Sequence, residues 1–183
     1  MKVFLIILNL VFSVALFAVN PNYTIFLYPD GNKPNDNGYV AADEEEKNKR
    51  LYKTSEPRMD IYLPKEKANA IILACPGGGY VFTSIPNEGE AVANYFTPRN
   101  IAVAVLKYRM PNQKQDIPLS DAVKAMEILR DSAQIWGVPT NHIGVIGFSA
   151  GGHLAASASC YHKAQEYADM LNINLDVVRE ANR

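Results

Sequence analysis

The sequence contains few of the residues that bind metals or form disulfides. Its 183 residues include two cysteines, three histidines and one tryptophan. Neither cysteine has a second one at zinc-site spacing and the histidines are not clustered, so no metal-ligand motif is present. Cys75 and Cys160 could form one disulfide in an exported protein. The placement of Cys75 at the end of an apolar run favours two buried free thiols instead.

An excess of charge of either sign is also missing. Lys and Arg total 18, Asp and Glu total 19, and the formal net charge is −1. We therefore expect no basic surface for nucleic acid or for an anionic membrane. The composition, 48% hydrophobic and 20% charged, is that of a single globular domain.

The only long apolar run lies at the N-terminus, where Met1 and Lys2 precede the apolar residues 3–19. A short basic start followed by such a run is typical of a secretory signal peptide, which we assign to residues 1–18. A membrane anchor is the alternative. About 17 apolar residues is at the lower limit for a span, and no basic stop signal follows. The sequence thus predicts a secreted or periplasmic protein with no stable membrane span after processing.

The residue pattern after the N-terminal run changes near residue 57. Residues 19–56 are polar and rich in turn signals, so we expect an irregular segment. Its charge run, residues 43–50, is interpreted as a solvated surface. Apolar and polar residues then alternate over 59–63, which predicts a half-buried strand.

From residue 70, apolar strands alternate with amphipathic helices. Continuous apolar runs predict core strands over 70–75, 101–106 and 143–146, and helical spacing predicts helices over 88–96 and 118–136. Strands that are hydrophobic throughout indicate an α/β fold with a mostly parallel sheet and helices on both faces. Ligands of such sheets bind at the carboxyl ends of the strands.

The third core strand leads directly into Gly147-Phe148-Ser149-Ala150-Gly151, and a run of small residues follows. A strand, then Gly-x-Ser-x-Gly, then a helix is the layout of a nucleophile elbow. Glycines on either side allow a strained turn that exposes the serine hydroxyl. Ser149 is therefore the candidate nucleophile of a hydrolase.

A second glycine-rich segment, Gly77-Gly78-Gly79, follows the first core strand. Attack of a serine on an ester carbonyl creates an oxyanion, which fixed backbone N–H groups stabilise by roughly 3–4 kcal/mol each. The N–H of Ala150, directly after the nucleophile and at a helix N-terminus, is a further expected donor. Both glycine-rich segments lie at the carboxyl ends of predicted strands.

Five segments together resemble the α/β-hydrolase group of secreted bacterial carbohydrate esterases and lipase-like proteins. They are Pro76–Tyr80, Glu88–Gly89, Val105–Arg109, Pro118–Ala122 and Gly147–Ala155. The group includes acetyl xylan and feruloyl esterases and some proteins labelled endo-1,4-β-xylanase. The resemblance implies a Ser-Asp-His triad with Ser149 as nucleophile, an oxyanion site of Gly78, Gly79 and Ala150, and no metal or organic cofactor. Tyr80 is similar to the residue that edges the acyl pocket.

The chain departs from this group after residue 160. The triad order is serine, acid, histidine, yet no histidine follows the acids beyond Ser149. His142 directly precedes the strand that leads to Ser149, so it should lie roughly 16 Å from the serine, at the wrong end of the sheet. His153 lies one helical turn past Ser149, where support of the turn is expected, and His162 lies at or beyond the helix end.

We therefore interpret residues 57–160 as the N-terminal half of an α/β-hydrolase domain, truncated after the nucleophile helix, and residues 161–183 as a divergent helical tail. The Ser149 strand should then be an edge strand. The predicted function is serine hydrolysis of acetyl or aryl esters of plant polysaccharides, impaired because the triad Asp and His are absent. A separate C-terminal half is a possible partner. The alternatives are a peptidase or lipase on the same scaffold and a catalytically silent protein that binds carbohydrate or a partner.

Overall fold

The computed structural model describes residues 20–114 and 116–160. The predicted signal peptide, the tail 161–183 and His162 lie outside these ranges. Within them, none of the helices combines the length and the apolar composition needed to cross a membrane.

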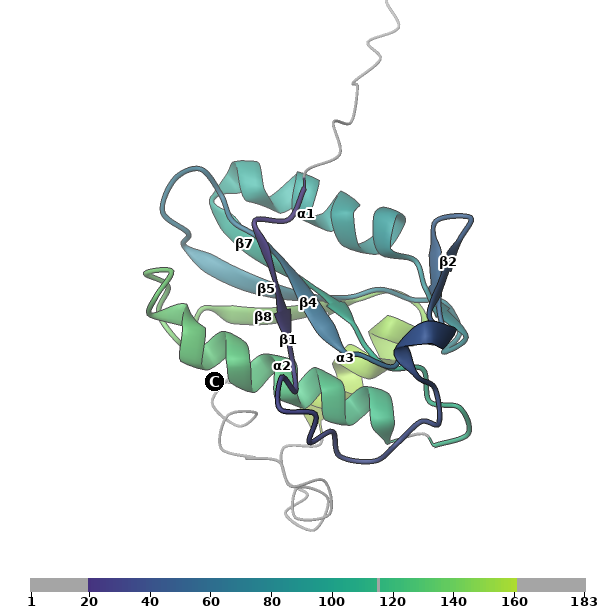
Figure 1. Ribbon diagram of the computed structural model, residues 1–183. Coiled ribbons are helices and arrows are strands. Elements are labelled where there is room, and N and C mark those ends of the chain that lie inside the picture. The colour runs from purple at the N-terminus through teal and green to yellow at the C-terminus, as the bar shows by residue number, and fades with distance from the viewer. Residues whose placement is uncertain (1–19, 115, 161–183) are drawn as a thin grey trace, which may run out of the picture.

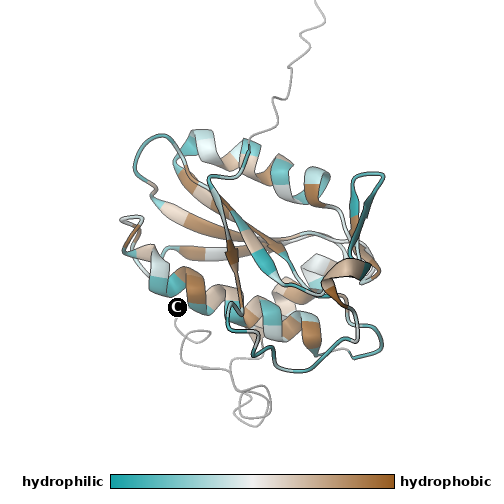
Figure 2. Ribbon diagram, viewed as in Figure 1, coloured by the Kyte–Doolittle hydropathy of each residue, from teal (hydrophilic) through white to brown (hydrophobic). Residues whose placement is uncertain are grey.

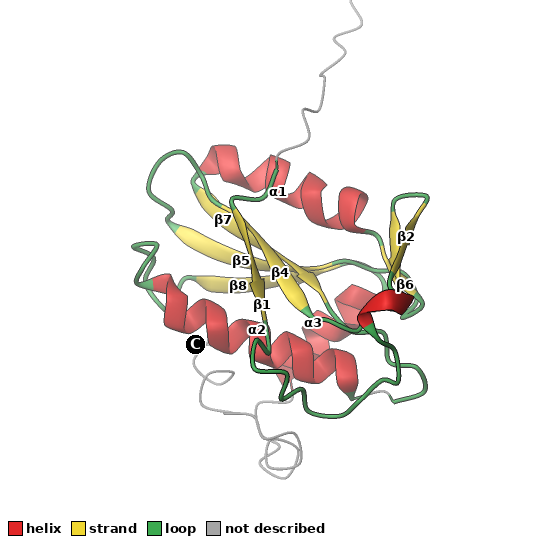
Figure 3. Cartoon of the chain, viewed as in Figure 1, coloured by secondary structure: helices red, strands yellow, loops and turns green. Residues whose placement is uncertain are grey.

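A five-stranded sheet forms the centre of the fold, in the order β1-β4-β7-β5-β8 (Figures 1 and 3). The strands are β1 (Tyr23–Phe26), β4 (Arg58–Tyr62), β5 (Ala70–Cys75), β7 (Ile101–Lys107) and β8 (Ile143–Gly147). The three core strands predicted from apolar runs, β7, β5 and β8, pair in parallel. Strand β4 pairs antiparallel with β7, and β1 with β4. The predicted fold class is confirmed, and β8 is an edge strand of the described sheet, as expected.

Helices cover both faces of this sheet (Figure 1). One face carries the π-turn η2 (Pro86–Glu90), α1 (Ala91–Phe96) and η3 (Thr97–Arg99). The other carries α2 (Ile117–Ala133) and α3 (Ala150–Cys160). Each layer buries its own apolar cluster, with Val92 against Val105 on the α1 side and Leu129 and Leu154 among the core residues on the α2 side. Figure 2 shows hydrophobic residues along the central strands and within the helices that flank them.

The helix boundaries follow local chemistry. Pro118 occupies the first turn of α2, where its missing N–H costs nothing. The helix ends at Ala133, three residues before the predicted end, and the chain turns at Gly137, whose φ is 70°. The helix predicted over 88–96 is present, but its first part is the π-turn η2.

The prediction of an irregular segment over 19–56 was wrong. This segment contributes β1, the 3₁₀ turn η1 (Ala41–Asp43), β2 (Glu45–Lys47) and β3 (Arg50–Tyr52). Strands β2 and β3 form a hairpin whose two turn residues, Asn48 and Lys49, have φ of 51° and 60°. Positive φ at both positions is the geometry of a tight hairpin turn. With β6 (Phe82–Thr83), the hairpin forms a second sheet in the order β2-β3-β6.

Strand β4 is more buried than its alternating pattern predicted. Asp60 and Tyr62 were expected to face water, but they are 6% and 1% exposed. Tyr62 lies in the cluster beneath α1 and the hairpin residue Leu51. Asp60 accepts a hydrogen bond from Thr24 at 2.7 Å and pairs with Lys107 at 2.6 Å. Strand β1, which pairs with β4, therefore contributes to the burial of Asp60, a position that the sequence pattern predicted to be exposed.

Candidate active site

Ser149 lies in a strained turn between β8 and α3. Its φ is 51°, in the left-handed region that serine rarely adopts, and its side chain is exposed. The turn requires both flanking glycines. A Cβ on Gly147 would lie 2.1 Å from the Gly151 carbonyl oxygen, and a Cβ on Gly151 would lie 2.0 Å from the Cys75 carbonyl oxygen. These close approaches are those of a nucleophile elbow.

Backbone hydrogen bonds attach this elbow to the neighbouring core strand. The Phe148 amide donates to the Cys75 carbonyl at 3.2 Å, and the Gly151 amide donates to the Phe148 carbonyl at 2.8 Å. Because Cys75 ends β5, the elbow lies where the first glycine-rich segment begins. The topology thus brings together two motifs that are about seventy residues apart in the sequence.

The glycine-rich loop of residues 77–80, called the oxyanion loop after its predicted role, packs directly on the elbow. A Cβ on Gly77 would lie 2.3 Å from the Phe148 carbonyl oxygen and 3.1 Å from the Ser149 Cβ. Gly78 and Gly79 have φ of 141° and 63°, which glycine adopts readily. The structure therefore places Gly78, Gly79 and Ala150, the predicted oxyanion donors, in segments that meet around Ser149.

Two hydrogen bonds hold this loop, one part-buried and one buried, and both involve residues to which the sequence assigned no role. The Gly77 amide donates to Glu88 Oε2 at 2.6 Å, and the Tyr108 hydroxyl donates to the Pro76 carbonyl at 2.8 Å. Glu88 lies on η2 and Tyr108 directly follows β7. Both belong to segments that resemble the esterase group, which was the only sequence signal for them.

Tyr80 connects the oxyanion loop to the nucleophile helix. Its hydroxyl forms a 2.8 Å hydrogen bond with His153 Nδ1, and its φ is 60°. His153 also donates its backbone N–H to the Ser149 carbonyl at 3.0 Å. His153 thus supports the turn, as expected.

Burial raises the pKa of three side chains in and beneath the loop. It raises the pKa of the Tyr80 and Tyr108 hydroxyls, and it raises the pKa of the Cys75 thiol to about 12. Both cysteines are free, as predicted, but Cys160 is exposed at the end of α3, which corrects the expectation that both are buried.

Among the residues that the structure describes, no side chain hydrogen-bonds to the Ser149 hydroxyl. His142 contacts the Asn69 carbonyl through Nδ1 at 3.0 Å. Over the same residues, no group of three or more His, Cys, Asp or Glu side chains is arranged to hold a metal ion.

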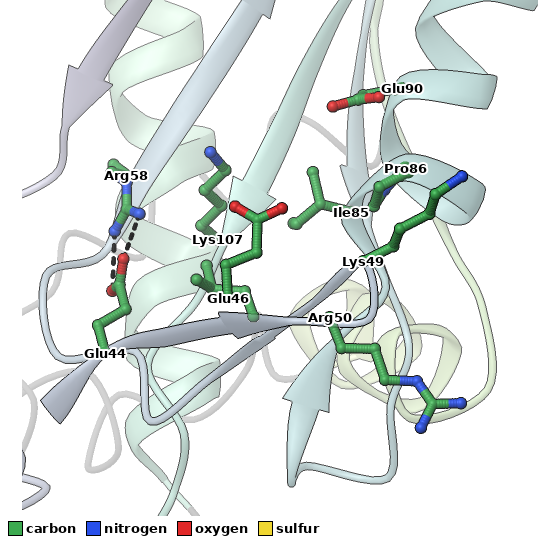
Figure 4. A pocket seen from close by; sticks show the side chains of 10 residues that line it. Glu44, Glu46, Lys49, Arg50, Arg58, Ile85, Pro86, Glu90 and Lys107 are labelled. Carbon is green, nitrogen blue, oxygen red and sulfur yellow. Dashed lines mark hydrogen bonds and ion pairs between the residues drawn. The ribbon is translucent and has the colours of Figure 1, made fainter.

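Two cavities lie on either side of the β2–β3 hairpin. The tyrosine cavity, about 450 Å³, is lined by Tyr39, Glu45, Tyr52, Tyr80, Asn112 and Gln113, among others. The charged cavity, about 260 Å³, is lined by acidic and basic side chains such as Glu46, Lys49 and Lys107 (Figure 4). Arg58 and Glu44 pair with each other there at 2.5 Å. Only the tyrosine cavity includes residues of the oxyanion loop.

Comparison with known proteins finds similarity to an esterase and to a protein named as a xylanase. The chain is 37% identical to an acetylxylan esterase of Xylanibacter ruminicola over 102 residues, which cover 56% of this chain and 21% of that protein. It is 30% identical to endo-1,4-beta-xylanase B of Butyrivibrio fibrisolvens over 126 residues, which cover 62% of this chain and 19% of that protein. The chain thus spans about a fifth of these curated relatives.

The similar solved structures also include ester hydrolases. An acetyl ester-xyloside bifunctional hydrolase of Caldicellulosiruptor lactoaceticus superposes with a TM-score of 0.64 and 26% identity, over 86% of this chain and 54% of that one. A thermophilic esterase of Thermogutta terrifontis with bound butyrate gives a TM-score of 0.52 and 29% identity, over 57% of this chain and 40% of that one.

The fold and the elbow therefore define an α/β-hydrolase of the esterase group. Residues 59–181 match the sequence model of the family described as BD-FAE, and the chain belongs to that family. The match continues past residue 160, so the resemblance includes most of the tail that was expected to diverge.

Proposed function

We propose that this chain carries the nucleophile and oxyanion site of a serine esterase that removes acyl groups from carbohydrate esters. The packing of Gly77 against the Phe148 carbonyl and the Ser149 Cβ is the observation that carries the proposal. This packing supports an oxyanion role for the glycine-rich loop, because it brings the loop to a strained, exposed serine. The acetylxylan esterase relative and the acetyl ester-xyloside hydrolase neighbour support the choice of an acylated carbohydrate.

The reaction follows from this geometry. The Ser149 oxygen attacks the ester carbonyl carbon, and the carbonyl oxygen takes up negative charge. The N–H groups of Gly78, Gly79 and Ala150 stabilise that charge. Collapse of the intermediate breaks the bond to the sugar oxygen, and this oxygen leaves as an alcohol by taking up the equivalent of the proton that the Ser149 hydroxyl gives up on attack. Water then attacks the acyl-serine, releases the carboxylic acid and restores Ser149.

Proton transfer is the step for which the described residues provide no group. A serine hydroxyl attacks slowly without a neighbouring base, so we expect this chain alone to be a weak esterase. The base and its acid would have to come from outside the described residues. Export through the predicted signal peptide fits a carbohydrate substrate outside the cytoplasm.

Labelling with a fluorophosphonate tests the proposal directly, because this probe reacts only with an activated serine. We expect slow labelling at Ser149, located by peptide mass spectrometry, and none in Ser149→Ala. Hydrolysis of p-nitrophenyl acetate should fall in parallel in that variant. Complete lack of labelling would instead favour a catalytically silent protein, the candidate suggested by the absence of a base around Ser149.

A further inference from the structure

The tyrosine cavity connects the oxyanion loop to two segments that carry no motif. Gly79 and Tyr80 form one wall, Tyr52 of the hairpin a second, and the loop after β7 with Asn112 and Gln113 a third. At about 450 Å³, its volume falls within the range of roughly 300–1,000 Å³ that is usual for small-molecule sites. A ligand in this cavity would lie beside the predicted oxyanion site.

The two faces of the β2–β3 hairpin line different cavities, because side chains alternate in direction along each strand. Glu45 pairs with Tyr52 in the β2–β3 register, and both line the tyrosine cavity. The next pair, Glu46 and Leu51, lines the charged cavity. Successive side chains of a strand point to opposite faces, so the hairpin presents a distinct face to each cavity.

The lining of the tyrosine cavity suits a neutral, hydroxyl-rich ring. Tyr39, Tyr52 and Tyr80 are half-buried and offer aromatic surface, whereas Asn112 and Gln113 are exposed and carry amide donors and acceptors. Among the lining residues, the negative charge of Glu45 is matched by the positive charge of Lys53. An anionic or cationic ligand would gain little from this balance.

Four residues of the cavity wall have a strained backbone conformation. Lys53, Tyr80, Asn112 and Gln113 have φ of 52°, 60°, 43° and 73°. Conformations of this kind persist only where surrounding contacts fix them, and they gather at ligand sites. The Asn112 amide donates to the Asn37 carbonyl at 2.7 Å, which ties the loop after β7 to the N-terminal segment.

We propose that the tyrosine cavity is a subsite for the neutral sugar residues of the ester substrate, with a pyranose ring against Tyr52. The assignment rests on the proposed esterase function for its substrate class. Sugar faces pack on aromatic rings, and their hydroxyls exchange hydrogen bonds with amides and carboxylates. The subsite would hold the leaving-group side of the substrate, while its acyl carbonyl lies at the oxyanion loop.

Binding of unacetylated xylotetraose to the full chain tests this proposal without any ester chemistry. We expect saturation-transfer NMR signals from the sugar and a Kd that rises roughly tenfold in Tyr52→Ala. Tyr52→Phe keeps the ring and should stay within about twofold of the unaltered chain. Tyr95→Ala removes a tyrosine that is 55% exposed on α1, across the sheet, and should leave the Kd unchanged.

A second variant covers the case in which Tyr52→Ala fails to fold. Gln113→Gly removes an exposed amide and keeps the positive φ, and it should weaken binding about threefold. Absence of xylotetraose binding, equal binding in all variants, or binding of methyl ferulate in its place would overturn the proposal. Fluorophosphonate labelling of Ser149 is scored separately, so loss of the esterase assignment and loss of the sugar subsite give different results.

Discussion

The Gly77 amide donates a 2.6 Å hydrogen bond to the carboxylate of Glu88, and this contact fixes the start of the oxyanion loop. Gly77 is buried, so its amide has no ready alternative in water. Glu88→Ala should lower the free energy of unfolding by about 1–3 kcal/mol, because it leaves a buried donor unpaired. Glu88→Gln keeps an acceptor and should cost clearly less. Urea denaturation measures both, and Glu90→Ala, which should cost under about 0.5 kcal/mol, is the control. Equal effects at positions 88 and 90 would contradict the assigned role.

The strained backbone at Ser149 predicts an unusual order of stabilities. Ser149→Gly and Ser149→Ala both remove the hydroxyl, but only glycine adopts a φ of 51° without strain. The glycine variant should therefore be more stable by about 1 kcal/mol. The same pair of substitutions at Ser157, inside α3, should give the opposite order by about 1 kcal/mol. Thermal or urea unfolding of the four variants decides the point, and an alanine variant at 149 as stable as the glycine one would refute it.

A buried ion pair holds the loop after β7. Arg109 and Asp121 are 1% and 0% exposed and approach to 2.7 Å, and the Arg109 guanidinium also donates to the Asn35 carbonyl at 2.6 Å. Asp121→Ala would leave a buried cation unpaired and should cost about 3–5 kcal/mol, measured by urea denaturation. Breaking the half-exposed Lys124–Glu127 pair with Glu127→Ala should cost under about 1 kcal/mol. Similar losses in the two variants would show that the buried pair is not a main anchor.

The two cysteines should differ in reactivity. Cys160 is exposed, whereas Cys75 is fully buried and its pKa is raised by burial from 9.0 to about 12. In the native chain at pH 8, we expect a thiol reagent such as DTNB to modify Cys160 alone, and both thiols after denaturation. Cys160→Ser should abolish the native reaction.

Because burial raises the pKa of Cys75, the free energy of unfolding should fall at alkaline pH. The stabilising effect of keeping the Cys75 thiol protonated is complete below pH 9 and is lost as the pH rises towards 12. Cys75→Ala should remove this part of the alkaline destabilisation, which is measured by unfolding at a series of pH values. Fast native modification of Cys75 at pH 8 would be incompatible with its burial.

Local sequence patterns were sufficient where one segment decides its own structure. The apolar runs of β5, β7 and β8 and the amphipathic spacing of α2 place these elements to within a few residues. The Gly-x-Ser-x-Gly motif is equally local as a pattern of residue types, although the close approach at Gly151 is to the distant Cys75 carbonyl. The hairpin β2–β3 was missed because its strands are short and exposed, and because Asn48-Lys49 is a weak turn signal beside Asn-Gly.

Contacts between distant segments could not be predicted from local sequence patterns. The sequence by itself determined the class of fold, the elbow at Ser149 and the glycines that can surround an oxyanion, since each depends on residue type and short-range spacing. Only the tertiary structure decided that Glu88 holds Gly77, that β1 buries Asp60, and that the hairpin closes a cavity beside Tyr80. The reason is physical. A hydrogen bond or a cavity wall forms between chain segments that the sheet order brings together, and periodicity within one segment carries no information about which partner it will meet.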